Sequence, residues 1–403
     1  MDAGKRPRRI AYVTSGDPYT PGKKSWSGTL YHVGLALQKF CGDVTFMGPM
    51  DAVVERLAGK VVHVGAKALL HKRYMYHHSA FVARRFGRLA TKRLARAEQP
   101  FDLIVACGAV DVAYLETDVP IMLVLDATHA RVCQYYPNYS NLLGQSCREL
   151  DSIENRAIRK AALLLYATNW AAQSAIEDYH ADPAKVHVVP FGANLDSQPL
   201  HTVLAMRKRS DRCRLLFVGV NWERKGGDIA VETLKRLEAL NIPAELIVCG
   251  CIPPSDVSHP SIRVIPYLNK HDPEQRAELD ALYLSSDFLL LPTRNECYGI
   301  AFCEASAFGL PAVTTHTGGV PEIVRDGETG FVLPLSARGE AYAAVIARAY
   351  GDEARYAELV SASRSAFEDR LNWDAWGTSA AHLIENTLGR TYAPPVSDVL
   401  RPG

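Results

Sequence analysis

The chain of 403 residues is long enough for two domains of ordinary size, and its 48% hydrophobic and 22% charged residues are typical of a globular protein. A formal net charge of +1 gives no overall field that would attract nucleic acid, so we expect no such partner. The nine cysteines form no CxxC pair, which argues against a zinc or redox site and favours reduced thiols. No apolar stretch reaches the ~20 residues needed to cross a bilayer, and none near the start is long enough for a signal peptide. We therefore expect a cytoplasmic protein.

Short apolar runs alternate with helical patterns through the first half of the chain. The runs predict strands at residues 9–14, 44–47, 61–64, 103–106, 121–125, 163–167 and 186–189. Helices between successive strands, beginning with residues 30–40, indicate a parallel sheet covered on both faces. The loop after the first strand lacks the GxGxxG pattern of dinucleotide-binding proteins, which argues against an NAD enzyme.

Residues 71–97 contain eight Lys or Arg residues and no acidic residue. On a helix, four of these cations fall on one face at steps of three and four residues: Arg85, Arg88, Lys92 and Arg96. Such a face could contact an anionic membrane, bind an anionic acceptor, or simply be a solvated outer surface. We keep peripheral contact with anionic lipid through residues 71–97 as a hypothesis.

The second half begins after a polar stretch that ends at Arg212, where we place the domain boundary. Strands are expected at residues 214–220, 245–249, 262–266 and 287–292, and helices at residues 228–240, 273–285, 338–369 and 374–388. Between the first of these strands and its helix lie Arg224 and Lys225, followed by two glycines. Cations beside backbone that a ligand can approach closely suit a diphosphate, although an Arg-Lys pair before a helix is also a common surface feature.

The stretch from residue 287 to residue 334 carries the densest chemical signal. A buried strand is followed by a loop and then by a short helix over residues 300–308, which ends at a glycine with a proline just beyond. Glu296 and Glu304 are eight positions apart, which on one helix would place them about 80° apart. We therefore place Glu296 in the loop and Glu304 inside the helix. The unpaired amides at the helix start, on Gly299, Ile300 and Ala301, would suit a phosphate.

Residues 295–305 (NECYGIAFCEA), with the GLP at 309–311, the GGVPE at 318–322 and the DGETGFV at 326–332, are together more specific than two glutamates alone. This region resembles the Glu-x7-Glu donor site of glycosyltransferase family 4, which comprises retaining enzymes of GT-B fold. The resemblance covers the second half closely and the first half only in outline. It implies an α/β protein of GT-B architecture, with two Rossmann-like parallel-sheet domains facing across a cleft. It also implies catalysis without a metal or other cofactor, and the chain shows no Asp-x-Asp metal signature.

The resemblance also implies roles for individual residues. It gives catalytic roles to Glu296, Lys225 and Arg224, together with a residue after the strand at 121–125 that is either Asp126 or His129. It implies that Glu296 binds the donor sugar. The residues implied to bind substrate are Gly28, Asn295, Tyr298, Gly299, Ile300, Ala301 and Glu304, with Glu304 on the ribose and Gly28 in a loop that contacts the donor diphosphate or the acceptor. The family usually has a cation where this chain has Val220, and Arg224 would substitute for it.

The expected domains are an acceptor-binding domain over residues 1–195, a linker over 196–212, a nucleotide-sugar-binding domain over 213–372, a helix over 373–388 that packs back on the first domain, and a tail over 389–403. The expected activity is retaining transfer of a hexosyl-type sugar from a UDP- or GDP-linked donor to the hydroxyl of a glycan, lipid or small molecule. The expected cytoplasmic location includes, as an option, a peripheral position at the inner face of the membrane through residues 71–97. The alternative is a non-catalytic nucleotide-sugar-binding protein or partner subunit of the same fold.

Overall fold

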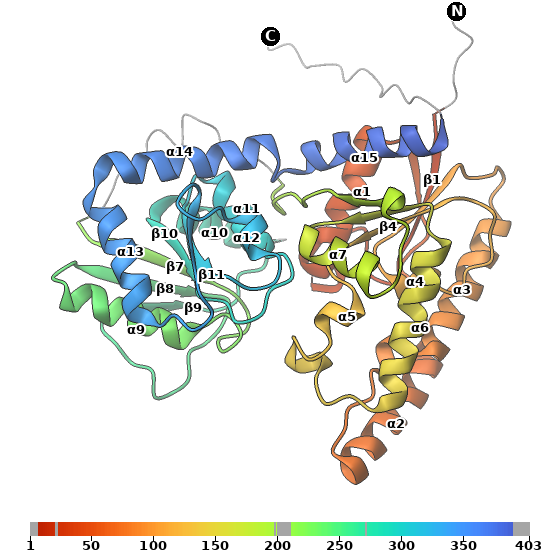
Figure 1. Cartoon of the computed structure of the whole chain (residues 1–403), viewed down its shortest axis with the longest axis horizontal. Coiled ribbons are helices and arrows are strands. Elements are labelled where there is room, and N and C mark those ends of the chain that lie inside the picture. Colours follow the sequence, from red (N-terminus) through yellow and green to blue (C-terminus); the bar gives the residue numbers. More distant parts are fainter. Residues whose placement is uncertain (1–6, 21–22, 197–198, 200–210, 271, 390–403) are drawn as a thin grey trace, which may run out of the picture. The chain divides into compact units, whose positions relative to one another are not determined.

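The computed structural model describes residues 7–20, 23–196, 199, 211–270 and 272–389 (Figure 1). The chain divides into two compact units. Unit 1 comprises Met1–Ala167, Ala171–Val189 and Trp373–Gly403, and unit 2 comprises Thr168–Trp170 and Pro190–Asn372. Each unit is built on a six-stranded sheet in which every recorded strand pair is parallel, so the predicted α/β fold with two Rossmann-like domains is confirmed.

Unit 1 has the strand order β2-β1-β3-β4-β5-β6. The strands are β1 (Arg9–Val13), β2 (Asp43–Phe46), β3 (Leu103–Ala106), β4 (Ile121–Leu125), β5 (Leu163–Tyr166) and β6 (Val186–Val188). Every residue of β3, β4 and β5 is buried, as expected for central strands with helices on both faces.

The α-helices of unit 1 are α1 (Thr29–Phe40), α2 (Val53–Leu70), α3 (Ala80–Ala95), α4 (Ala109–Val112), α5 (His129–Val132), α6 (Gly144–Lys160) and α15 (Trp373–Leu388), while α7 (Asn169–Glu177) begins in unit 2 and continues in unit 1. Short 3₁₀ turns are η1 (Lys23–Gly28), η2 (Tyr76–His78), η3 (Pro137–Tyr139) and η4 (Pro183–Lys185). Of the basic segment 71–97, the helix begins only at Ala80, where the Ser79 side chain accepts a hydrogen bond from the Val82 amide.

One predicted strand of unit 1 is wrong. Residues 61–64 lie in the middle of α2, because a four-residue apolar run does not distinguish a strand from part of a helix. The two buried residues of α2, Gly59 and Ala66, are seven positions apart, which is a helical spacing.

Unit 2 has the strand order β12-β11-β10-β7-β8-β9. The strands are β7 (Cys213–Val218), β8 (Ala244–Cys249), β9 (Ile262–Ile265), β10 (Phe288–Leu291), β11 (Ala312–Thr315) and β12 (Gly330–Leu333). The helices are α9 (Gly227–Ala239), α10 (Pro273–Ser285), α11 (Ile300–Ala307), α12 (Val320–Ile323), α13 (Gly339–Gly351) and α14 (Glu353–Asp369). The long helix expected over 338–369 is divided at Asp352, whose side chain caps α14 by accepting a hydrogen bond of 3.0 Å from the Arg355 amide.

The last helix, α15, packs against α1 within unit 1 (Figure 1). Gly377 makes the close approach possible, because a Cβ there would lie 2.3 Å from the Phe40 ring. The ion pair Lys39–Asp374, at 2.8 Å, closes one end of the contact. The predicted linker and tail fall largely outside the described residues. No described helix is both long and apolar enough to span a bilayer.

Candidate functional site

The candidate site of unit 2 lies where two neighbouring parallel strands end. β10 pairs with β7, with Phe288 beside Leu215, so the loops that leave their carboxyl ends lie at the same edge of the sheet. The turn after β7 carries Arg224 and Lys225 and leads into α9. The loop after β10 carries Glu296 and leads into α11.

The two loops are held together by their backbones. Gly226 has a φ of +76°, and a Cβ there would lie 2.1 Å from the Pro292 carbonyl oxygen, so only glycine lets the turn come this close to the end of β10. The Arg294 amide donates a hydrogen bond of 2.7 Å to the Arg224 carbonyl, and the Thr293 hydroxyl donates another of 3.2 Å to the same oxygen. The cationic turn is therefore fixed against the acidic loop.

Both cations meet the Glu296 carboxylate. Lys225 Nζ lies 2.5 Å and Arg224 Nη1 3.1 Å from the same oxygen, Oε2, and Arg224 also donates to the Asn295 carbonyl at 2.9 Å. The side chains are 9% exposed for Lys225, 12% for Glu296 and 23% for Arg224. Burial alone would raise the pKa of Glu296, but the two cations outweigh burial and hold that pKa below its ordinary value. Glu296 is therefore an anion at neutral pH.

The start of α11 lies beside this cluster. Gly299, which precedes the helix, has a φ of +93°, and a Cβ there would lie 2.5 Å from the Phe302 ring and 3.2 Å from Glu296 Cγ. Glycine therefore lets the helix begin directly beside the carboxylate. The amides of the first turn, which include those of Ile300 and Ala301, carry the positive end of the helix dipole.

Glu304 lies inside α11 and is only 2% exposed. One carboxylate oxygen pairs with the Lys270 ammonium, and the other accepts a hydrogen bond of 3.1 Å from the Tyr283 hydroxyl. Neither Lys270 nor Tyr283 is among the site residues predicted from the sequence. The available signal for Lys270 was its position after β9, at the same carboxyl-end edge of the sheet as Glu296.

Tyr298, the other predicted contact in this loop, has a buried side chain. Its hydroxyl donates a 2.5 Å hydrogen bond to the Phe191 carbonyl inside unit 2. Any contact between this residue and a substrate would therefore be made by its main chain.

A cavity of about 740 Å³ lies at the carboxyl ends of β7, β8 and β9. It is lined by Val220, Asn221, Trp222, Glu223, Gly250, Cys251, Ile252, Pro254, Pro266 and Tyr267. Its wall runs directly into the turn that carries Arg224 and Lys225. This cavity could not be predicted from the sequence, because its lining comes from three separate loops.

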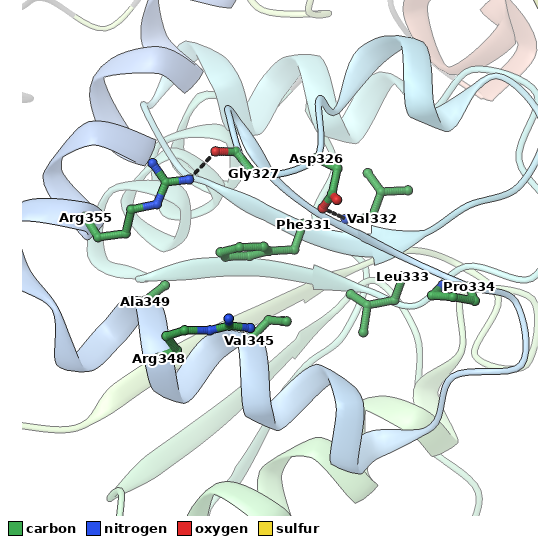
Figure 2. Close-up of a pocket in the computed structure, with 10 residues that line it drawn as sticks. All are labelled: Asp326, Gly327, Phe331, Val332, Leu333, Pro334, Val345, Arg348, Ala349 and Arg355. Carbon is green, nitrogen blue, oxygen red and sulfur yellow. Dashed lines mark hydrogen bonds between the residues drawn. The ribbon is translucent and has the colours of Figure 1, made fainter.

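A second cavity, of about 420 Å³, lies beside the edge strand β12 (Figure 2). The ring of Phe331 lies between Arg348 on α13 and Arg355 on α14, and Arg355 also bonds to the Gly327 carbonyl. None of the predicted site residues lines this cavity.

The two predicted site residues that follow β4 in unit 1 differ in their exposure. Asp126 follows β4 at the carboxyl end of the strand and is partly exposed. His129 begins α5 and is buried, with its Nδ1 2.8 Å from an Asp151 carboxylate oxygen. The other ring nitrogen, Nε2, is also buried and has no hydrogen-bond partner in the described part of the chain.

Gly28 caps the start of α1 with a φ of +99°. The two residues before it, Trp26 and Ser27, also have positive φ values of 51° and 56°. Such a conformation costs free energy in residues other than glycine and is found most often at functional sites. The structure thus places an unusual turn at the loop singled out in the sequence.

The comparisons with solved structures define the class of fold. Over 95% of its length and 99% of the other protein, the chain superposes on sucrose-phosphate synthase from Thermosynechococcus elongatus with a TM-score of 0.64 and 17% identity. It superposes on the Anabaena protein HepE, solved with UDP and glucose, with a TM-score of 0.59 and 15% identity, over 94% of this chain and 100% of the other. The chain therefore has the two-domain GT-B fold.

The sequence comparisons point to the same class. Residues 205–366 match the family model described as glycosyl transferases group 1. A D-inositol 3-phosphate glycosyltransferase of Xylanimonas cellulosilytica is 27% identical over 242 residues, which are 55% of this chain and 56% of that protein. The match thus spans little more than half the length of this curated relative. These likenesses support a GT-B glycosyltransferase.

Proposed function

We propose that the protein is a retaining glycosyltransferase of family 4, which transfers a hexosyl-type sugar from a nucleotide-diphosphate sugar to an acceptor hydroxyl. The observation that carries the proposal is the convergence of Arg224 and Lys225 on Glu296 beside the start of α11. The UDP and glucose bound to HepE support a sugar nucleotide as donor, and the name of the Xylanimonas relative supports glycosyl transfer.

The cations and the helix start would act on the departing diphosphate. As the bond from the sugar to the β-phosphate breaks, negative charge grows on the phosphate, and prearranged cations stabilise that charge more than they stabilise the bound substrate. Arg224 and Lys225 are held within about 3 Å of a carboxylate, and a diphosphate would compete for them with its own anionic oxygens. We assign the amides of Gly299, Ile300 and Ala301 to the same diphosphate.

We assign the remaining parts of the donor to other groups of unit 2. Glu296 and Asn295 would bind hydroxyls of the transferred sugar. Glu304 would bind the ribose, with Lys270 adjusting to share the carboxylate, since a carboxylate has about four acceptor positions. The cavity of about 740 Å³ would take the nucleobase, because it adjoins the cationic turn and offers the ring of Tyr267 and the peptide edges of its loops.

We propose that unit 1 binds the acceptor, with Gly28 in its binding loop. Asp126 is the better placed of the two residues after β4, since the His129 ring is enclosed by unit 1. The base is proposed to be uracil or guanine and the acceptor a glycan, a lipid or a small glycoside. We also propose a cytoplasmic location and turnover that does not depend on a metal.

The first experiment is a thermal-shift panel of the purified chain with UDP, GDP and ADP, followed by the sugar nucleotides of the base that binds. A ligand at 100 times its dissociation constant adds about 2.7 kcal/mol to the free energy of unfolding, so one base should raise the Tm clearly. A folded protein that responds to none of them would contradict the donor site. Binding without sugar transfer to any acceptor in a screen would favour the non-catalytic alternative.

Turnover is then measured with and without EDTA, once a donor and an acceptor are known. We expect equal rates. Loss of turnover with EDTA and recovery with magnesium or manganese would contradict the metal-independent mechanism.

A further inference from the structure

Helix α2 of unit 1 turns its large apolar side chains away from the protein. Only two of its 18 residues, Gly59 and Ala66, are buried. Val54 is 75% exposed, Val61 74% and Leu69 82%. Eight of the 17 exposed large hydrophobic residues in the described part of the chain lie on this one helix: Val53, Val54, Leu57, Val61, Val62, Val64, Leu69 and Leu70. An exposed apolar concentration of this kind marks a contact surface.

The helix is held on unit 1 by its small and polar residues instead. Gly59 lies against Tyr76, where an added Cβ would be 2.5 Å from the Tyr76 Cβ. His63 Nδ1 accepts a hydrogen bond of 3.2 Å from the Tyr74 amide. Because this side of the helix already makes the contacts with unit 1, the apolar side is left for another partner.

The apolar residues form one continuous face. At 100° per residue, the eight side chains run from Val53 at 0° to Val62 at about 180°, apart from Leu70 in the last turn. Lys60 and Lys67 fall at about 340° and 320°, on the rim between the apolar face and the side that contacts unit 1. The helix is therefore amphipathic, with its apolar face turned away from unit 1 and lysines along one edge of that face.

The surface around this face carries more unpaired positive charge than negative charge. The only acidic residue of α2, Glu55, lies 3.9 Å from Arg85 of α3, and the Arg56 guanidinium pairs with Asp51. Lys60 and Lys67 are exposed and have no ion-pair partner within the described residues. An apolar face bordered by unpaired ammonium groups is complementary to a layer that has an apolar interior and anionic groups at its surface.

The basic helix α3 lacks the apolar half of this combination. Val82 and Phe86 are buried in unit 1, and Phe81, at 63% exposed, is the only large apolar residue of this helix that is largely exposed. Two of its arginines are engaged elsewhere in the unit, Arg85 with Glu55 and Arg93 with the Met47 carbonyl. A membrane contact made through residues 71–97 would therefore be mainly electrostatic, with Phe81 as its one large apolar contribution.

We propose that α2 is a membrane-docking helix, which lies in the plane of an anionic phospholipid surface with its apolar face in the acyl boundary. Its 18 residues are about 27 Å long, and the exposed valines and leucines would enter the lipid while Lys60 and Lys67 reach the phosphates. A second copy of the chain fits this face less well, since antiparallel pairing of two such faces, about a two-fold axis perpendicular to the helices, would bring the like-charged lysine edges together.

The test is cosedimentation of the full chain with phosphatidylcholine vesicles, with and without phosphatidylglycerol. We expect binding to the anionic vesicles that weakens with added salt and little binding to the neutral ones. Val61→Glu should lower the partition coefficient by about tenfold or more, because it places a charge in the acyl boundary, and the pair Lys60→Glu with Lys67→Glu should do the same. The matched control is Leu240→Glu on unit 2, which removes an exposed leucine outside α2 and should leave binding unchanged.

Thermal melts of each variant confirm that it is folded, which is expected because the substituted side chains are exposed. Equal binding of the wild type to both kinds of vesicle, or unchanged binding of Val61→Glu, would overturn the proposal. Sedimentation velocity without lipid measures whether the chain forms a dimer. A wild-type dimer that Val61→Glu converts to a monomer, together with no vesicle binding, would show that α2 is instead a contact between copies of the chain.

Discussion

At the scale of single residues, the Glu296 carboxylate is held by two cations that the proposed reaction requires. We expect Lys225→Ala to lower turnover by at least ~100-fold, the usual loss for one prearranged polar contact to a developing charge. Lys235→Ala is the matched control, because Lys235 is an exposed lysine on α9 of the same unit. Steady-state kinetics with the identified donor measure both variants. A near-normal rate for Lys225→Ala would remove this lysine from the site.

Glu154 is a buried carboxyl that the proposed reaction does not use. Burial, with a smaller contribution from the Asp151 charge, raises its pKa from 4.5 to about 8, and its Oε1 has no partner among the described residues. Because the folded pKa exceeds the unfolded one, the stability that this group contributes is complete below about pH 4.5 and is lost as the pH rises through about 8. The free energy of unfolding should therefore fall across that window.

Glu154→Gln should remove this pH dependence, since the amide stays neutral at every pH. We expect its Tm to exceed that of the wild type by several degrees at pH 8 and to match it at pH 4.5. Glu98→Gln, at an exposed position of unit 1, is the control and should follow the wild type throughout. A Glu154→Gln variant that is less stable than the wild type at pH 8 would mean that this carboxyl is ionised and bound in the folded protein.

At the scale of elements, Gly299 determines how close α11 starts to Glu296. We expect Gly299→Ala to weaken nucleotide binding and to lower stability by about 1–2 kcal/mol or more, since a positive φ is unfavourable for alanine and the new Cβ would collide with Phe302. Gly351→Ala is the control in the same unit, because its Cβ would meet nothing within 4 Å. Isothermal titration with the nucleotide and urea unfolding provide the two readouts. Wild-type affinity in Gly299→Ala would show that this backbone conformation is not needed for binding.

The helices and strands also show which parts of the fold and site could be predicted from sequence patterns. The buried strands could be predicted because strongly apolar runs bounded by polar loops have few alternatives, and β3, β4 and α10 have the expected bounds. The strand predicted over residues 61–64 is wrong because a short apolar run is compatible with both a strand and part of a helix such as α2. Lys270 could not be placed, since its contact with Glu304 spans 34 residues and depends on where a loop folds. The spacing of Glu296 and Glu304 did carry information, because a single strand–loop–helix unit positions both.

At the scale of the whole molecule, unit 1 is formed from the start of the chain and from its last described helix, α15. We expect Gly377→Ala to destabilise unit 1, because the new Cβ would lie 2.3 Å from the Phe40 ring and force α15 away from α1. Hydrogen exchange should increase in α1 and in β1 and β2, while the strands of unit 2 keep their protection. Ser379→Ala, at an exposed position of α15, is the control. Exchange that increases equally in both units would mean that the two unfold as one cooperative body.

The return of α15 to unit 1 also has a consequence for synthesis on the ribosome. Unit 2 contains no residue beyond Asn372, so all of it has been translated before the ribosome reaches Trp373. Unit 1, whose sheet is translated first, lacks α15 until the chain has been made through Leu388. Domains usually fold in the order in which they emerge. Here the unit that is translated first is the last to be completed, and the side of α1 that receives α15 stays uncovered while all of unit 2 is made.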